Sequence, residues 1–330
     1  MPTPPKRPPA VQAQRGQVFL ILVLLIVVGA GALIYSMASP DRDAIKRDKL
    51  TVAALAQARD ALIGFAAALQ YSGTERPGNL PCPDVDGFGN QGSSCNSNGV
   101  RIGRLPWKSL GLPDLRDGYG APLWYAVSEN FRKSTAAAIA LNSNTPGNLT
   151  VTGTTPATNV IAIVFAAGPV VGNQDRNPST TSTCTTTGSS KKNHLCPTNY
   201  LEGGNENADT TFVTGLATTS FNDQLLLITS DNLFPAVEMR VAREARSVLR
   251  TFYSVNNFFP FANAYSDSSY QCTNNQHSGR IPQYFTDNCK QVSTQADWFG
   301  TGVNWSSWFF SNNWHHVVFY AVSPKCAKPS

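Results

Sequence analysis

The sequence predicts an α+β protein in which a long N-terminal transmembrane helix precedes a helix-plus-strand unit that occurs twice. Three observations lead to this fold class. The stretch from Val18 to Met37 is apolar and uncharged, residues 44 to 69 continue with helical spacing, and a pattern within residues 58 to 128 recurs within residues 245 to 323. The length of 330 residues allows one large domain or two modest ones, since a domain usually has about 100 to 200 residues.

The predicted membrane helix begins directly after a short basic tail. No charged residue lies between Gln17 and Ser39, and twenty residues of helix rise about 30 Å, the thickness of the hydrocarbon core of a bilayer. This run is longer than the apolar core of about 7 to 15 residues in a secretory signal, which favours a retained anchor. The segment Ala38-Ser39-Pro40 resembles a signal-peptidase site, so a cleaved signal stays open as an alternative. The helix would include Val18, Phe19, Leu20, Ile21 and Met37.

A second helical pattern follows the apolar run. Apolar residues recur mostly at intervals of three or four, which is the spacing of one helix face. Joined to the span, this helix would cover about 53 residues and about 80 Å, and Pro40 would bend it near the membrane surface because proline removes one helical hydrogen bond. The stripe consists of Ile45, Val52, Leu55, Ala58, Leu62, Phe65, Ala66 and Leu69.

Charge and cysteine content limit the environment of the chain. Lys and Arg number 26 against 21 Asp and Glu, and only 14% of residues are charged, compared with about 25% in a typical domain. A nucleic-acid partner held by a dense basic surface is therefore excluded. Both flanks of the span carry basic residues, so the positive-inside rule does not decide its orientation. The seven Cys residues all follow the span, which favours an oxidising compartment for the bulk of the chain and a cytoplasmic N-terminus.

The repeated pattern predicts a helix, a turn-rich loop, a Gly-Arg-x-Pro turn and an apolar aromatic strand in each copy. Between the copies, residues 160 to 165 and 224 to 228 are expected to be buried strands. Residues 142 to 159 and 173 to 199, rich in Thr, Ser, Asn and Gly, are expected to be surface loops. The first copy contains Ala58-Arg59, Leu62, Phe65, Pro81, Gly103 to Pro106 and Leu123 to Ser128; the second contains Ala245-Arg246, Leu249, Phe252, Pro260, Gly279 to Pro282 and Val318 to Ser323.

The second copy is expected to start with a helix that runs to Phe252. Ser230 or Asp231 would cap it, since short polar side chains are preferred at helix N-termini. Pro235 would fit in the first turn, where a missing N–H costs little.

The order of Gln14-Arg15-Gly16, then Gln17, then an apolar helix resembles the leader of type IV pilins and type II secretion pseudopilins. The resemblance implies that a prepilin peptidase cuts between Gly16 and Gln17 and leaves the whole apolar helix on the mature protein. It also implies a helix-plus-antiparallel-sheet domain in the periplasm, an inner-membrane anchor and assembly with other pilin or pseudopilin subunits. Ile21 stands where the family usually has an acidic residue, at the fifth mature position, which suggests a minor subunit.

A second resemblance covers the first copy. The run Arg76 to Asp84, with Gly103 to Leu112 and Leu123 to Ser128, is similar to uncharacterised pseudopilin-like proteins of Gram-negative bacteria. With these resemblances, the chain divides into a basic leader at 1–16, the transmembrane and amphipathic helix at 17–70, a first periplasmic pilin-like domain at 71–229 and a second, repeat-related unit at 230–330.

The cysteines suggest local disulfides. Three pairs each close a loop of about 13 to 18 residues, worth about 3 kcal/mol in the chain-entropy model, although six cysteines permit 15 pairings. Cys326 is left over. A zinc site from Cys184, His194 and Cys196 is a weak alternative, because the spacing matches no common zinc finger. The expected pairs are Cys82 with Cys95, Cys184 with Cys196, and Cys272 with Cys289.

Candidate metal and catalytic residues are few. Asp84, Asp86 and Asn90 match the start of a calcium loop only in part, because Phe88 replaces one ligand and no Glu stands at the twelfth position, so an Asx turn is favoured. No metal or cofactor is expected. His315 and His316 would head a strand and face opposite sides. No common nucleophile or phosphate-binding motif is present, so no enzymatic activity is predicted. Acidic residues in predicted loops are expected at the surface: Glu75, Asp114, Asp117, Glu202 and Glu206.

An aromatic cluster near the C-terminus provides the alternative function. Interleaved with Asn and Ser, it could stack on sugar rings or face a partner subunit, or it could fill the core of the second copy. The first option would make the chain a membrane-anchored periplasmic binding module rather than a fibre subunit. The cluster contains Trp298, Phe299, Trp305, Trp308, Phe309, Phe310 and Trp314.

Overall fold

The computed structural model describes residues 1–2, 15–37, 40–70, 75–93, 95, 102–132, 140–184, 189–207, 209–285, 289, 296–298 and 303–327. The chain forms two compact units, Met1–Leu50 and Thr51–Ser330. The predicted segments 71–229 and 230–330 both lie in the second unit, where one apolar core contains residues of both.

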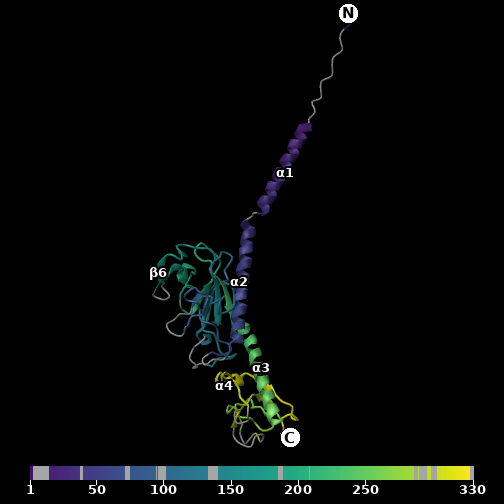
Figure 1. The fold of residues 1–330 in the computed structure, drawn as a ribbon, viewed down its shortest axis with the longest axis vertical. Helices are drawn as coiled ribbons and strands as arrows, with labels where there is room; N and C mark the ends of the chain where they lie inside the picture. The colour runs from purple at the N-terminus through teal and green to yellow at the C-terminus, as the bar shows by residue number, and fades with distance from the viewer. Residues whose placement is uncertain are drawn as a thin grey trace. The chain divides into compact units, whose positions relative to one another are not determined.

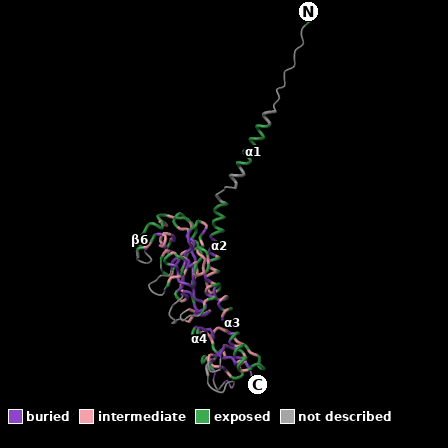
Figure 2. Tube along the Cα trace, viewed as in Figure 1, coloured by how far each residue is buried: buried purple, intermediate pink, exposed green. Residues whose placement is uncertain are grey.

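Two helices begin the chain (Figure 1): α1, Arg15–Met37, and α2, Pro40–Ala68. The side chains from Phe19 to Val28 are all exposed, as Figure 2 shows, and a helix that is apolar all round requires an apolar environment. Pro40 is the first residue of α2, a position that suits the fixed φ of proline. Ala38 and Ser39 lie outside the described residues, so the expected kink at Pro40 stays a prediction.

In the second unit, one face of α2 is buried against an antiparallel sheet. On this face, Ala58, Leu62 and Ala66 have no exposed surface. The sheet has the order β1-β2-β5-β9, and Figure 1 shows it beside α2. The predicted strand at 224–228 is confirmed, although within it only Ile228 is buried, and the predicted buried strand at 160–165 corresponds to β5, which is buried throughout. The bounds are β1, Ile102–Arg104; β2, Trp124–Val127; β5, Ala162–Ala166; and β9, Gln224–Ile228.

A second sheet covers the other face of the first. Successive side chains of a strand point to opposite faces, so β5 contributes to two cores. Val164 faces the α2 side and Phe165 faces the second sheet. Phe165 packs against Phe212 with ring centroids 5.3 Å apart. The second sheet has the order β4-β3-β8, with β3 antiparallel to β4 and parallel to β8. Its strands are β3, Leu149–Gly153; β4, Ala157–Val160; and β8, Thr211–Thr214.

The two predicted loops are therefore partly wrong. Residues 142 to 159 contain β3 and most of β4, because Leu149 and Val151 alternate with Thr residues and bury their side chains. Residues 173 to 199 contain the hairpin of β6, Thr181–Cys184, and β7, Ser189–Lys192. The described connections of this part of the chain contain three short 3-10 helices: η1, Glu129–Phe131; η2, Asn193–Leu195; and η3, Pro197–Asn199.

The third long helix, α3, spans Ser230–Asn256. Its N-cap is Thr229, not the predicted Ser230 or Asp231, and Asn232 Oδ1 accepts the backbone N–H of Thr229 at 3.1 Å. Pro235 lies beyond the first turn. The buried face of α3 carries Leu233, Phe234, Val237, Val241, Ala245, Val248 and Phe252.

The last part of the unit packs short elements against α3. Phe252 lies at the centre, stacked on Phe285 at 5.6 Å and edge-on to Trp298 at 5.4 Å. In this part of the unit, aromatic side chains rather than a large sheet cover the buried face of α3. The elements are β10, Ser278–Arg280; β11, Tyr284–Phe285; β12, Ala296–Asp297; α4, Ser307–Ser311; η6, Trp314–His316; and β13, Phe319–Ala321.

The two strand pairs β1–β2 and β10–β13 have the same register. Gly103 pairs with Tyr125 in the first, and Gly279 pairs with Tyr320 in the second. On the other side of each glycine-bearing strand, Asp84 bridges to Arg104 and Asn263 bridges to Arg280. The pattern that recurs in the sequence therefore forms the same local structure twice. The predicted Gly-Arg-x-Pro turn is wrong, because the Gly and Arg of each copy lie in a strand that pairs with the following aromatic strand.

Candidate functional site

The cysteines form the three local pairs that their spacing suggests. Cys82 is bonded to Cys95, Cys184 to Cys196 and Cys272 to Cys289, with Cα atoms 5.6, 5.4 and 5.6 Å apart. Cys326 is free and exposed. The disulfides indicate that this part of the chain lies outside the cytoplasm. The weak zinc alternative fails, because the thiols of Cys184 and Cys196 are bonded to each other.

The acidic loop that starts at Asp84 is held by its own backbone. Asp84 Oδ1 accepts the N–H groups of Asp86 and Gly87 at 3.0 and 2.8 Å, and Oδ2 accepts that of Gly89 at 2.8 Å. Asp86 accepts the N–H of Phe88, and Asn90 is exposed. These contacts form Asx turns, in which the carboxylates accept hydrogen bonds from the backbone of their own loop. Among the described residues, no group of three or more His, Cys, Asp or Glu side chains is placed to hold a metal ion.

Asp117 is buried, contrary to the expectation of a solvated surface residue. Its Oδ1 accepts the N–H groups of Tyr119 and Ala121, each at 2.9 Å, and its Oδ2 accepts that of Gly168 at 2.9 Å. Burial raises the pKa of Asp117, and these bonds and the nearby Arg176 oppose that rise. Its role is structural, because it fixes the turn before β2 to the end of β5.

A pair of carboxyl groups lies near the start of β9. Asp223 is 5% exposed, and its Oδ2 accepts the N–H of Glu202 and the Nδ2–H of Asn205, each at 2.9 Å. Burial, and then the charge of Glu202, raise the pKa of Asp223 to about 8. Asp223 therefore holds a proton at neutral pH. The sequence pattern placed Glu202 at the surface and did not single out Asp223, because the two residues are adjacent only in the fold.

The two histidines lie in η6 rather than at the head of a strand. His315 is 2% exposed, with Tyr270 and Phe310 rings each 5.1 Å away. His316 stacks on Tyr270 at 4.1 Å. Burial, with the charges of His316 and Arg280, lowers the pKa of His315 to about 3. His315 is thus a neutral core residue and not an acid–base group at physiological pH.

The tryptophans form core rather than an exposed platform. Trp298, Trp308 and Trp314 are 3%, 2% and 1% exposed, and Trp298 donates its Nε1–H to the Pro282 carbonyl at 2.7 Å. Trp305 is half-buried and stacks on Phe309 at 4.0 Å. Phe299 lies outside the described residues. Three of the four tryptophans of the predicted ligand or partner surface are therefore buried and cannot contact a ligand in this structure.

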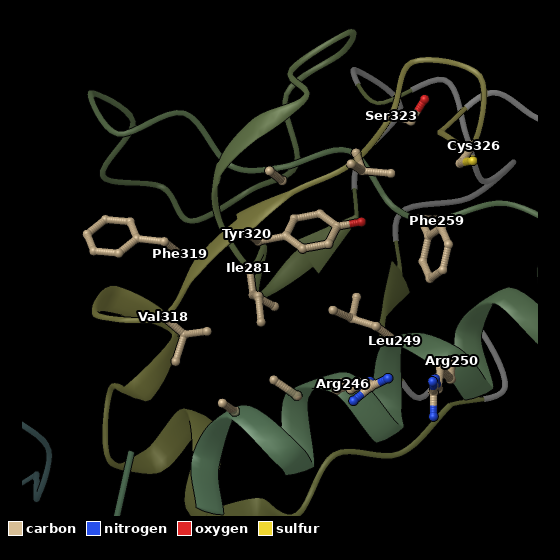
Figure 3. Close-up of a pocket in the computed structure, with 14 residues that line it drawn as sticks. Arg246, Leu249, Arg250, Phe259, Ile281, Val318, Phe319, Tyr320, Ser323 and Cys326 are labelled. Carbon is tan, nitrogen blue, oxygen red and sulfur yellow. The ribbon is translucent and has the colours of Figure 1, made fainter. Parts of the chain in front are cut away.

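A concave apolar surface lies between α3 and β13, and many residues of the second copy of the repeat line it. The sequence does not predict a groove there, because its walls come from segments far apart in the chain. We call it the α3–β13 groove; its volume is about 510 Å³. Figure 3 shows Leu249 and Ile281 pointing toward one another across it, while Phe319 points away. Its walls are Ala242, Ala245, Arg246, Leu249 and Arg250 of α3, with Phe259, Ile281, the segment Val318 to Ser323, and Cys326. None of the described residues that line it is acidic.

Among the described residues, one helix, Arg42–Ala68, is long and apolar enough to cross a membrane by length and composition, and Phe19–Gly31 is a shorter apolar helical stretch. Burial distinguishes between them. In Arg42–Ala68, Leu55, Leu62 and Ala66 face the core of the second unit, which assigns this part of α2 to the protein interior. The apolar helix α1 is therefore the element of the kind found in membrane spans and secretory signals.

No family model, no curated protein and no solved structure matches this chain.

Proposed function

We propose that the protein is a minor pilin-like or pseudopilin-like subunit of a type II secretion or type IV pilus assembly. The observation that carries the proposal is the apolar helix α1, which starts at Arg15-Gly16 and exposes every side chain from Phe19 to Val28. Such a helix requires lipid or other apolar helices around it. In this role α1 first anchors the chain in the inner membrane, with the N-terminus in the cytoplasm and the bulk in the periplasm, and later packs among like helices in a fibre.

The rest of the fold supports this role. The face of α2 that carries Ala58 and Leu62 is buried under an antiparallel sheet, so the segment after the anchor is part of a folded head rather than a flexible linker. Disulfides stabilise that head outside the cytoplasm. We also propose that the head is an internally duplicated pilin-like fold, because β1–β2 and β10–β13 share one register. The role is mechanical and requires no reaction.

The test is the N-terminal residue of the protein extracted from membranes, with and without prepilin peptidase. The proposal expects an N-terminus at Gln17 only when the peptidase is present, since the cut falls between Gly16 and Gln17. Gly16→Leu should block this processing. Gly29→Leu is the matched control, because a side chain at Gly29 meets no atom within 4 Å, and it should be processed normally.

Two results would contradict the proposal. An uncleaved N-terminus in the presence of the peptidase would favour a membrane-anchored binding module. A soluble mature protein that begins after Pro40 would show that α1 is a secretory signal.

A further inference from the structure

We propose that the α3–β13 groove, with the open edge of β13, binds an extended apolar and acidic segment of a partner protein as an added antiparallel strand. Strand addition of this kind combines backbone hydrogen bonds with pockets for alternate side chains. The inference goes beyond the proposed role of the chain in an assembly. It depends on the second unit alone and would hold for any membrane arrangement of α1.

The first half of the second unit shows what occupies the equivalent place. There β2 pairs with β1 on one edge and with β5 on the other. Trp124 lies opposite Phe165 and Ala126 opposite Ile163. Among the described strands of the second half, β13 pairs with β10 alone. A strand equivalent to β5 is absent among the described residues of this half.

The backbone of β13 presents free groups on that edge. The Val322 N–H donates to the His277 carbonyl at 2.8 Å, which places Val322, and two residues earlier Tyr320, in the hydrogen-bonded positions toward β10. The N–H and C=O groups of Phe319 and Ala321 therefore point to the outer edge. Within the described part of the chain they have no backbone partner there. Their counterparts Trp124 and Ala126 face β5.

The groove has the chemistry of an uncovered core. In the first half, the side chains of Ala162, Val164 and Ala166 of β5 lie in the core that contains Ala58 and Leu62. At the corresponding helix positions of the second half, Ala245 and Leu249 line an open groove of about 510 Å³. Beside it, the Phe319 side chain is 72% exposed and the Tyr265 ring lies 5.5 Å away. An apolar segment with small or branched residues at alternate positions would cover this surface.

The positive charge at the rim of the groove indicates that the partner segment is acidic. Arg246 and Arg250 line the groove and are exposed, and neither forms an ion pair with a described residue. A carboxylate on the incoming segment would be attracted to both guanidinium groups. The same attraction would disfavour basic segments.

The experiment uses the full chain in detergent micelles and a fluorescent peptide with the sequence of residues 160 to 168, flanked by two aspartates at each end. Binding is followed by fluorescence anisotropy. Ala321→Pro removes one outward N–H and leaves the bonds to β10, since proline is tolerated on an edge strand. The double variant Arg246→Glu, Arg250→Glu reverses the rim charge. Arg243→Glu makes the same change on an exposed part of α3 outside the groove and is the control.

We expect saturable binding that weakens at least tenfold in Ala321→Pro and in the double variant and stays within twofold in Arg243→Glu. Amide hydrogen exchange between residues 317 and 323 should slow at least tenfold in the complex. Circular dichroism would confirm that each variant is folded. A variant that misfolds would be replaced by Ala321 with an N-methylated amide.

Three outcomes would overturn the proposal. The first is a wild-type chain that does not bind the peptide, and the second is binding that the Ala321 change does not affect. The third is a dimer whose contact protects β13, which would make a second copy of the chain the occupant.

Discussion

Asp223 Oδ2 accepts the backbone N–H of Glu202 at 2.9 Å, so two carboxyl-bearing residues from different segments of the chain meet at the edge of the first sheet. The pair predicts a stability that depends on pH. Because the pKa of Asp223 is raised to about 8 from its ordinary value, the folded state keeps a proton that the unfolded state loses. The contribution of this proton to the free energy of unfolding is fully present below about pH 4. It falls as the pH rises to about 8, by at most about 1.4 kcal/mol per pH unit.

Asp223→Asn should remove most of this pH dependence and stabilise the protein at pH 8, because the amide oxygen still accepts from Glu202 and Asn205. The measurement is urea unfolding from pH 4 to pH 8. Asp209→Asn, at an exposed position, is the control and should leave the slope unchanged. If the free energy of unfolding of Asp223→Asn falls with pH as steeply as that of the wild type, the carboxyl pair is not the source of the pH dependence.

Trp298→Ala should destabilise the protein by about 3 to 5 kcal/mol, the usual cost of deleting a large buried aromatic side chain. The residue is 3% exposed and contacts Phe252 and Phe285. Phe88→Ala is the matched control, because Phe88 is 66% exposed, and its effect should stay within about 0.5 kcal/mol. Chemical denaturation of both variants would decide the matter. Equal stability of the two variants would mean that Trp298 is a surface residue.

Gly103→Ala should cost about 1 to 3 kcal/mol, the range found for overpacked sites. A Cβ atom there would lie 2.6 Å from the carbonyl oxygen of Asp84, which is backbone and bridges to Arg104. Gly279→Ala should behave in the same way, since its Cβ would meet the carbonyl oxygen of Asn263.

Gly64→Ala is the opposite case and tests the same reasoning. Gly64 lies within α2, and a Cβ atom there meets nothing within 4 Å. Alanine should therefore stabilise the helix by up to about 1 kcal/mol. Thermal unfolding distinguishes the three variants, and a stabilising Gly103→Ala would contradict the close approach of the two strands.

Cys326 should be the one cysteine that reacts with a maleimide in the folded, unreduced protein. It is exposed and free, while the other six cysteines are paired. Intact mass spectrometry should therefore show one adduct per chain, and Cys326→Ser should show none. Two or more adducts on the wild type would mean that at least one disulfide does not form.

Local patterns could be predicted because their physical cause is local. The spacing of three and four residues around Leu62 and around Val241 predicts helices, and the structure has α2 and α3 there. The sequence pattern does not predict the β3–β4 pair, because five of its nine residues are threonine, asparagine or glycine. In a strand with one buried face, only every second residue has to be apolar.

Periodicity acts over a few residues, so the amino-acid order is enough to specify the helices α1, α2 and α3 and the twofold occurrence of the Gly-Arg-x-Pro motif. The predicted turn at this motif is wrong, because its Gly and Arg lie in strands β1 and β10. Which of the two matching surfaces is covered depends instead on the folded chain. Trp124 is 1% exposed and its counterpart Phe319 is 72% exposed, although both are aromatic residues in the same register. Burial is set by the distant segments that pack against a side chain, and β5 and the second sheet cover the first surface while nothing described covers the second.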